Sequence, residues 1–504
     1  MSRYKVSAAL VAAGMIVGPG AYAADFDTKA PVYTKAPIAP STCMTFYDFL
    51  ATSCPLTWYG ITVYGTVDVG VGYQTHGAPF NKYFPTGASY FINKMNRQAM
   101  WGLAPNGLSQ SNIGIKGREQ IAPGIDFIFQ LEAGFDPYSL QFANAPQSIL
   151  QNRGLALNQQ SINADSSRNG TFYNSVGFAG ISSAAYGTLT AGRQNSLTLD
   201  GVNAYDPMGG SYAFSPIGWS GTSAGGGDTE NARATTSVKY RFQYSDFRLG
   251  ALYQFGSYDL GNGATGQYQG QIGGDIKHLG PGVLSLDGIY GYARNAVNLG
   301  LSGGGGPYIG SSPLTPFTPQ TTLTATLSNN TVWMALAKYT VGPLKIMGGY
   351  EYINYAPPSD VPSSLVDSNG GTWIGTGFPG TSISSTNYNG TVGNGTDKHL
   401  QIMWIGAKYA VTENVEVTAA YYHYIQNNFL VAGAGKSCTG TYGNEGNGDC
   451  AGTLDAVSGL IDWKFAPKWD TYLGVMFSQV NGGLANGYLT RNNLDPTVGL
   501  RFRF

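Results

Sequence analysis

The feature that most constrains this chain is a two-residue alternation of apolar and polar side chains, which recurs in sixteen segments of about 8–14 residues. The last segment shows the pattern well, because Val498, Leu500 and Phe502 fall on one face of an extended chain. Successive side chains of a β-strand point to opposite faces, so each strand meets two different environments. The segments begin at Trp58, Ser109, Gly124, Phe172, Gly187, Thr235, Phe247, Gln267, Gly282, Val332, Pro343, Leu400, Asn414, Leu454, Trp469 and Asp495. We therefore predict an all-β chain.

The connections between these segments alternate in length. Tight turns such as Gly342-Pro343 are followed by long loops such as residues 74–108 and 355–399. One end of the sheet therefore carries short turns and the other carries large loops, which is typical of an outer-membrane β-barrel. A β-sandwich would not separate its loops in this way, and a propeller would repeat every ~45 residues. The pattern predicts a transmembrane antiparallel β-barrel of 16 strands, with lipid outside and water inside.

The composition agrees with a β-barrel and argues against other classes of protein. Only 11% of the 504 residues are charged, and no apolar run beyond the N-terminus reaches the ~18 residues of a membrane-spanning helix. A net charge of -1 does not favour a nucleic-acid partner. The four histidines lie in no Gly-x-Ser-x-Gly or His-Glu-x-x-His motif. We expect no catalytic residues, no metal and no cofactor, and hence no enzyme.

The N-terminus carries the signature of a bacterial signal peptide. Arg3 and Lys5 precede an apolar run, and small residues at 21 and 23 form a cleavage site, so residues 1–23 are expected to be removed on export. Residues 24–57 contain Pro-rich repeats and two cysteines, and we expect them to form a periplasmic N-terminal segment, in which the repeats from residue 25 to about residue 40 favour an extended linker. The barrel domain is then expected to span residues 58–504.

The four cysteines form two local pairs, Cys43 with Cys54 and Cys438 with Cys450. In an exported protein, even numbers of closely spaced cysteines favour disulfides over metal ligands. We predict that each pair closes a local loop.

One connection differs from the others in composition. Residues 199–230 are too long for a turn and too rich in large apolar side chains, such as Tyr205, Met208, Phe214 and Trp219, to remain in water. A loop of this kind usually packs against something. We predict that it folds into the barrel lumen and sets the size of a pore.

Several stretches resemble the general-diffusion porins of Gram-negative outer membranes. The similar stretches are 64–68 (Tyr-Gly-Thr-Val-Asp), 113–117 (Ile-Gly-Ile-Lys-Gly), 129–135 (Phe-Gln-Leu-Glu-Ala-Gly-Phe) and 187–194 (Gly-Thr-Leu-Thr-Ala-Gly-Arg-Gln), together with Asp200 and the terminal strand. The similarity runs from Trp58 onward, and the cysteine-containing leader looks like that of alphaproteobacterial porins.

This resemblance implies a homotrimer of 16-stranded barrels in the Gram-negative outer membrane, with the third external loop folded inward. It implies passive diffusion of ions and small hydrophilic solutes through a water-filled channel. The expected partners are outer-membrane lipids, lipopolysaccharide and the barrel-assembly machinery, which would read the terminal Phe504.

The pore of such a protein has cations on one wall and carboxylates on the loop. Strand parity places Asp68, Glu132 and Lys239 inward, together with the candidates for a basic wall, which are Lys116, Arg233 and Arg241. The acidic candidates on the loop are Asp200 and Asp206, although an aspartate beside Gly or Pro also caps turns. Asn112 and Ser175 stand where the family has two further wall arginines, so the sequence does not support anion selectivity.

Arg193 lies on the opposite parity, with Leu189 and Ala191. An unpaired arginine facing lipid costs about 2–4 kcal/mol at mid-membrane and little near the interface. We expect Arg193 at the rim of the barrel or at a subunit interface, and the resemblance favours the interface.

Two other functions remain open. Tyr212, Phe214 and Trp219 could line an aromatic track in a substrate-specific channel for sugars or small acids. Alternatively, the long loops could serve a surface adhesin or a structural barrel without a conducting pore.

Overall fold

The computed structural model describes residues 42–77, 90, 98–138, 140, 173, 175–217, 233–255, 266–300, 324–356, 397–428, 451–483 and 490–504. The predicted signal peptide and the predicted pair Cys438–Cys450 lie outside these residues. Neither described helix is long and apolar enough to cross a membrane.

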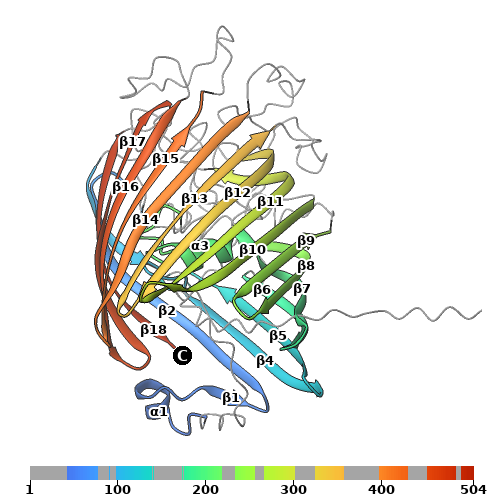
Figure 1. Cartoon of the computed structure of the whole chain (residues 1–504). Helices are drawn as coiled ribbons and strands as arrows, with labels where there is room; N and C mark the ends of the chain where they lie inside the picture. The colour runs from blue at the N-terminus through green and yellow to red at the C-terminus, as the bar shows by residue number, and fades with distance from the viewer. Residues whose placement is uncertain are drawn as a thin grey trace, which may run out of the picture.

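The described strands form one antiparallel sheet that closes on itself (Figure 1). The strands are β1 (Leu56–Trp58), β2 (Ile61–Gln74), β3 (Met100–Pro105), β4 (Asn112–Ala122), β5 (Ile125–Gly134), β6 (Val176–Ser183), β7 (Gly187–Asn195), β8 (Arg233–Tyr244), β9 (Phe247–Gln254), β10 (Gly266–Leu279), β11 (Gly282–Gly300), β12 (Thr324–Val341), β13 (Leu344–Ala356), β14 (Lys398–Thr412), β15 (Val415–Gln426), β16 (Gly452–Ala466), β17 (Trp469–Gly482) and β18 (Asn492–Arg503). The helices are α1 (Phe46–Ala51) and α3 (Leu197–Tyr205).

Closure follows from the pairing of β18 with β2. Residues 61–66 of β2 pair with β4, and residues 69–74 of β2 pair with β3. Strands β3 and β4 therefore share one position in the wall. The short strand β1 pairs only with the start of β2. The wall therefore has sixteen strand positions, which confirms the predicted 16-stranded antiparallel barrel.

The alternation seen in the sequence becomes an alternation of exposure. On β15, Ala420 and Tyr422 are buried, whereas Tyr421 between them is exposed. Large apolar side chains on the outer face, such as Ile405 and Leu473, are more than half exposed at 58% and 57%. An apolar outer face is what a barrel wall presents to lipid.

The tight turns at one end of the barrel use glycine where the backbone needs a positive φ. Gly124 between β4 and β5, Gly280 between β10 and β11, and Gly342 between β12 and β13 have φ values of 72°, 66° and 54°. Other residues avoid this region because their Cβ atoms clash with the backbone. The Pro/Gly dipeptides of the sequence thus specify where neighbouring strands reverse.

Helix α3 contacts the five strands β9 to β13. Its large side chains Leu197, Val202 and Tyr205 are among those that are buried. The chain that follows it, through Ile217, is also largely buried. We call residues 196–217 the inner segment. It packs against strand residues of the inward parity, which are buried with it in one apolar cluster.

Candidate functional site

The inner segment begins with a capped helix. Strand β7 ends at Asn195, and the Ser196 side chain accepts a hydrogen bond from the Leu199 amide at 3.1 Å, which caps α3. The amide of Leu197 donates to the side-chain oxygen of Gln269 on β10 at 2.5 Å. Asp200 lies in the first turn, where a helix favours a negative charge. The sequence thus delivers a carboxylate to the inward side of the sheet directly after a strand.

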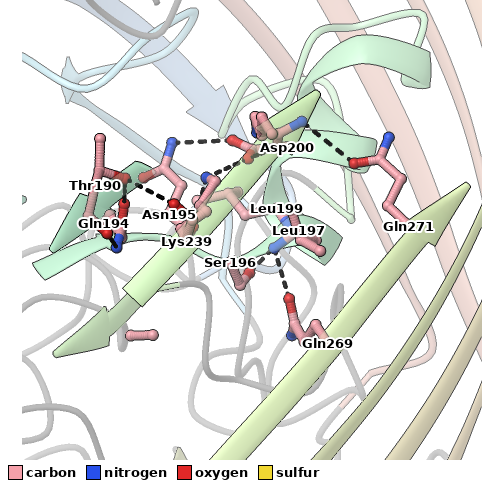
Figure 2. A network of polar contacts seen from close by, with 12 residues as sticks. Thr190, Gln194, Asn195, Ser196, Leu197, Leu199, Asp200, Lys239, Gln269 and Gln271 are labelled. Atoms are coloured by element: carbon pink, nitrogen blue, oxygen red, sulfur yellow. Dashed lines mark hydrogen bonds and ion pairs between the residues drawn. The ribbon is translucent and has the colours of Figure 1, made fainter. Parts of the chain in front are cut away.

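Asp200 meets two cations from β8, Lys239, which Figure 2 labels beside it, and Arg241. Its carboxylate accepts from Lys239 Nζ at 2.6 Å and from the guanidinium of Arg241. Arg241 also donates to Gln271 at 3.2 Å, and Lys239 donates to the carbonyl of Asn195 at 2.9 Å. The ionic side chains of this cluster are only 10–14% exposed. Burial raises the pKa of Asp200, but Arg241 and Lys239 more than offset this effect and hold the pKa below its ordinary value.

A second ionic cluster holds the end of α3. The hydroxyl of Tyr205 donates to Asp287 on β11, and Arg248 on β9 contacts the same carboxylate at 2.9 Å. Arg248 also pairs with Asp275 on β10 at 2.5 Å. Tyr205 is further fixed by its carbonyl, which accepts from the indole of Trp404 on β14 at 3.0 Å. Both ends of the helix are therefore anchored to the wall by polar contacts.

Asp206 has a different environment from Asp200. It accepts hydrogen bonds from the Tyr422 hydroxyl at 2.6 Å and from the amides of Gly210 and Met208 at 2.7 and 3.2 Å. Burial raises the pKa of Asp206 above its ordinary value. These contacts match the turn-capping alternative, and no ion pair among the described residues involves this carboxylate.

Three glycines show how closely the inner segment approaches other parts of the chain. A Cβ atom on Gly406 would lie 2.7 Å from Pro207, and one on Gly474 would lie 2.6 Å from Phe214. Within the segment, a Cβ on Gly201 would lie 2.7 Å from Ile289 on β11. Real Cβ contacts are longer than this, so the segment is packed at the density of a protein core.

Lys116 does not join the Asp200 cluster. Its ammonium group lies 5.4 Å from the centroid of the Tyr64 ring, and the Tyr64 hydroxyl donates to Glu132 on β5 at 3.1 Å. Ser175 donates to the other oxygen of Glu132. Lys116 thus belongs to a separate polar group on β2, β4 and β5, and its predicted role in the basic wall stays a prediction.

The parity that placed Arg233 inward is wrong. The β7–β8 register shifts, because Gly192 pairs with Ser237 whereas Gln194 pairs with Ala234. This β-bulge contains Thr236, whose φ is 49°. The extra residue exchanges the inward and outward positions at the start of β8, before the bulge. Ala234, rather than Arg233, therefore shares the inward side with Ser237, and only the family resemblance supports Arg233 as a wall residue.

Arg193 pairs with Gly177 on the outward parity, as the sequence predicted. Its exposed fraction is nevertheless only 6% within a single chain. Its assignment to a subunit interface or to the rim stays a prediction.

Sequence reasoning missed the clusters that hold the wall together. Arg501 contacts Asp470 at 2.9 Å, and Tyr472 donates to the buried Asp68 at 2.6 Å. Asp68, which parity placed inward, also accepts from the amides of Leu108 and Ser109. The inward parity of these residues on adjacent strands was available as a signal, but their pairing depends on a register that the sequence does not show.

Comparison with known proteins decides the family. A family model for Gram-negative porins matches residues 8–483. The chain is a member of the Gram-negative porin family. This porin is therefore placed in the outer membrane of a Gram-negative bacterium, as the sequence predicted.

Individual relatives of this porin are distant. It is 25% identical over 243 residues to an outer membrane porin protein of Bordetella pertussis. The aligned residues cover 48% of this chain and 53% of the relative. It thus spans about half the length of the curated relative that it matches.

Two solved structures support the fold. The anion-selective porin from Comamonas acidovorans has a TM-score of 0.53 at 16% identity, with 88% of this chain and 99% of that chain covered. A loop-deletion mutant of OmpT, an outer membrane protein of Vibrio cholerae, has a TM-score of 0.50 at 13% identity, with 88% and 99% covered. At these identities the similarity shows the β-barrel fold alone.

Proposed function

We propose that this porin forms a water-filled channel for passive diffusion of ions and small hydrophilic solutes, narrowed by the inner segment folded into the lumen. The observation that carries the proposal is the contact of Asp200 with Lys239 and Arg241, because it joins a loop carboxylate to cations of the inward wall. Charged groups at a constriction screen ions by sign and orient dipolar solutes. No catalytic role is needed for this work, and we propose that the chain is not an enzyme.

The charges near α3 predict weak ion selectivity. Lys239, Arg241 and Arg248 supply three positive charges. Asp200, Asp275 and Asp287 supply three negative charges. Within these two ion-pair clusters the sums cancel, and each carboxylate touches a cation, so the clusters add little net field on a passing ion. Lys338, 5.5 Å from the centroid of the Tyr205 ring, and Asp206, which follows α3, lie outside these clusters. The Comamonas acidovorans protein is named as anion-selective, but we propose no strong preference for anions here.

A substrate-specific channel for sugars or small acids is the second candidate. The inward positions from β13 to β17 include large apolar or aromatic side chains, namely Ile353, Leu400, Ile402, Tyr422, Leu454, Met476 and Val480. Porin interiors are usually polar. These side chains are buried in one cluster with the inner segment, so a solute would contact them only after movement of that segment.

The remaining assignments are proposals that rest on the resemblance or on the sequence patterns described above. They comprise the homotrimer, the contacts with lipids and lipopolysaccharide, the reading of Phe504 by the assembly machinery, the division into residues 1–23, 24–57 and 58–504, and the bond between Cys438 and Cys450. An adhesin or structural barrel without a conducting pore is the third alternative.

Single-channel recording in a planar bilayer under a salt gradient tests the proposal. A general pore predicts large, ohmic and long-lived openings in steps of three, with a reversal potential near zero. Small conductance that one class of solute blocks would favour the specific channel. Absence of conductance from folded trimers would refute both and leave the structural barrel.

A further inference from the structure

The short segment before the barrel, residues 42–58, has a defined fold of its own. Cys43 and Cys54 form a disulfide with a Cα–Cα distance of 5.2 Å. Between them lies α1, which begins with a capping box in which Thr45 and Asp48 exchange hydrogen bonds of 3.0 Å. A six-residue helix is too short to be stable alone in water. The disulfide and the contacts of the segment with the barrel must therefore hold it.

The segment pairs with β2 next to the seam at which the barrel closes, which is the pairing of β18 with β2. The last residue of the chain, Phe504, exchanges two hydrogen bonds of 3.0 Å with Gly65 on β2. Beyond this point β18 has ended, and the same edge of β2 pairs with β1, where Leu56 lies opposite Val63 and Trp58 opposite Ile61. An unpaired strand edge exposes amide and carbonyl groups. β1 occupies the edge that the shorter C-terminal strand leaves open.

The stapled helix also covers the end of the C-terminal strand. The Phe49 ring meets the rings of Phe502 and Phe504 edge-on, at centroid distances of 5.5 and 5.2 Å. The indole of Trp469, at the start of β17, donates to the carbonyl of Leu50 at 2.9 Å. The helix thus packs on the end of the final strand through aromatic rings, and a hydrogen bond ties it to the neighbouring strand β17.

Lys468, in the turn between β16 and β17, connects residues 42–58 to the barrel wall. Lys468 donates to the carbonyls of Phe49 and Cys54 at 3.0 and 2.8 Å, and it lies 4.8 Å from the centroid of the Phe49 ring. Its side chain is 7% exposed. A buried ammonium group needs such acceptors, because desolvation is costly.

We propose that residues 42–58 form a disulfide-stapled latch that holds the β18–β2 seam closed at the short-turn end of the barrel. A strand end frays unless it is tied down, and Phe504 directly follows β18, the strand that closes this barrel. The latch keeps Phe504 in place by extending the sheet with β1 and by covering the terminal rings with α1. Because the disulfide persists only in an oxidising compartment, the latch is locked after export. Breaking the disulfide frees α1 and exposes the C-terminus, while the rest of the barrel stays folded.

Release of Phe504 by carboxypeptidase A from the detergent-folded mature protein measures opening of the latch. The parent for the experiment is C438S/C450S, in which Cys43–Cys54 is the only possible disulfide and which serves as the matched control for cysteine removal. We expect slow release from this parent when oxidised. After reduction and alkylation, or in the variant that also carries C43S/C54S, we expect release at least about tenfold faster.

Two further measurements make the test independent of folding defects and of channel activity. Phe49→Leu removes the ring contacts with the disulfide intact, and we expect it to speed release by an intermediate factor. Heat-modifiable migration on gels reports whether the barrel itself is folded. Equal release rates with and without the disulfide would overturn the latch. Faster release accompanied by loss of the folded band would also overturn it, because the disulfide would then stabilise the whole barrel rather than the seam.

Discussion

Replacing Asp200 by Asn removes one negative charge where the inner segment meets the wall. The amide is nearly isosteric, so the shape of the proposed constriction is kept, while Lys239 and Arg241 lose their shared carboxylate. Tyr205, Trp404 and the Asp206–Tyr422 contact continue to hold the segment. Breaking a buried ion pair costs about 3 kcal/mol, so we also expect a lower melting temperature. The main effect is an uncompensated positive charge beside the path of ions.

The size of the effect follows from Coulomb's law. A unit charge about 5 Å from an ion in water contributes about 0.8 kcal/mol, and screening at 0.1 M salt reduces this to about 0.5 kcal/mol. Anions gain and cations lose by this amount, so the permeability ratio changes by a factor of about 5. In a tenfold potassium chloride gradient, this ratio shifts the reversal potential by about 30 mV toward anion selectivity. At 1 M salt the shift falls to about 10 mV.

Planar-bilayer recording of the purified protein under both salt conditions measures this shift. Asp126→Asn is the matched control, because it removes the same charge from a pair with Arg118 beside the β4–β5 turn. We expect that control to change the reversal potential by less than a third as much. A reversal potential in Asp200→Asn equal to that of the wild type, with unchanged conductance, would refute the placement of Asp200 at the constriction.

Three other changes test the same site. Arg241→Gln removes a cation but leaves the 2.6 Å pair between Lys239 and Asp200, so the reversal potential should shift toward cations by about 30 mV; a shift toward anions would contradict the assignment. Gly406→Ala puts a Cβ atom 2.7 Å from Pro207 and 2.3 Å from the Ala419 carbonyl, and it should destabilise the protein by about 1–3 kcal/mol and add current noise. The control Gly459→Ala, with no atom within 4 Å of its Cβ, should be neutral by thermal melting and by recording. Because the pKa of Asp200 is held below its ordinary 3.8, its stabilising charge is present above that value and is lost as the pH falls through the lower folded pKa. The difference in reversal potential between wild type and Asp200→Asn should therefore persist to a lower pH than an ordinary aspartate allows, and vanish only in stronger acid.

Local patterns in the sequence were sufficient for most strands and turns, but they did not show β1 or β3, and β3 forms within residues 74–108, which were predicted to be a loop. Alternation with period two located all sixteen strand positions, including the segments at Gln267 and Val332, where β10 and β12 form. The positive φ of Gly280 and Gly342 explains why the Gly-Pro dipeptides mark turns. These features depend on neighbours in the chain, so they can be read without knowing which strands pair.

The candidate site was only partly predictable, and the errors have one physical cause. The inward parity of Lys239 and Arg241 was correct because no bulge separates them, whereas Arg233 lies beyond the bulge that reverses the faces of β8. The sequence could not show that Asp200 meets two cations while Asp206 meets a tyrosine, since these partners lie 39 to 216 residues away in the chain.

The sequence by itself therefore determined that this protein is a β-barrel with short turns at one end and long loops at the other. Local rules suffice for this result, because each strand needs only an alternating pattern and each tight turn a residue that tolerates its backbone geometry. Only the tertiary structure decided which charges meet, where a bulge exchanges the faces of a strand, and that residues 42–58 fold against the end of β18. Those outcomes depend on strand register and on contacts between distant residues, and a shift of one residue in register moves every side chain to the other face of the sheet.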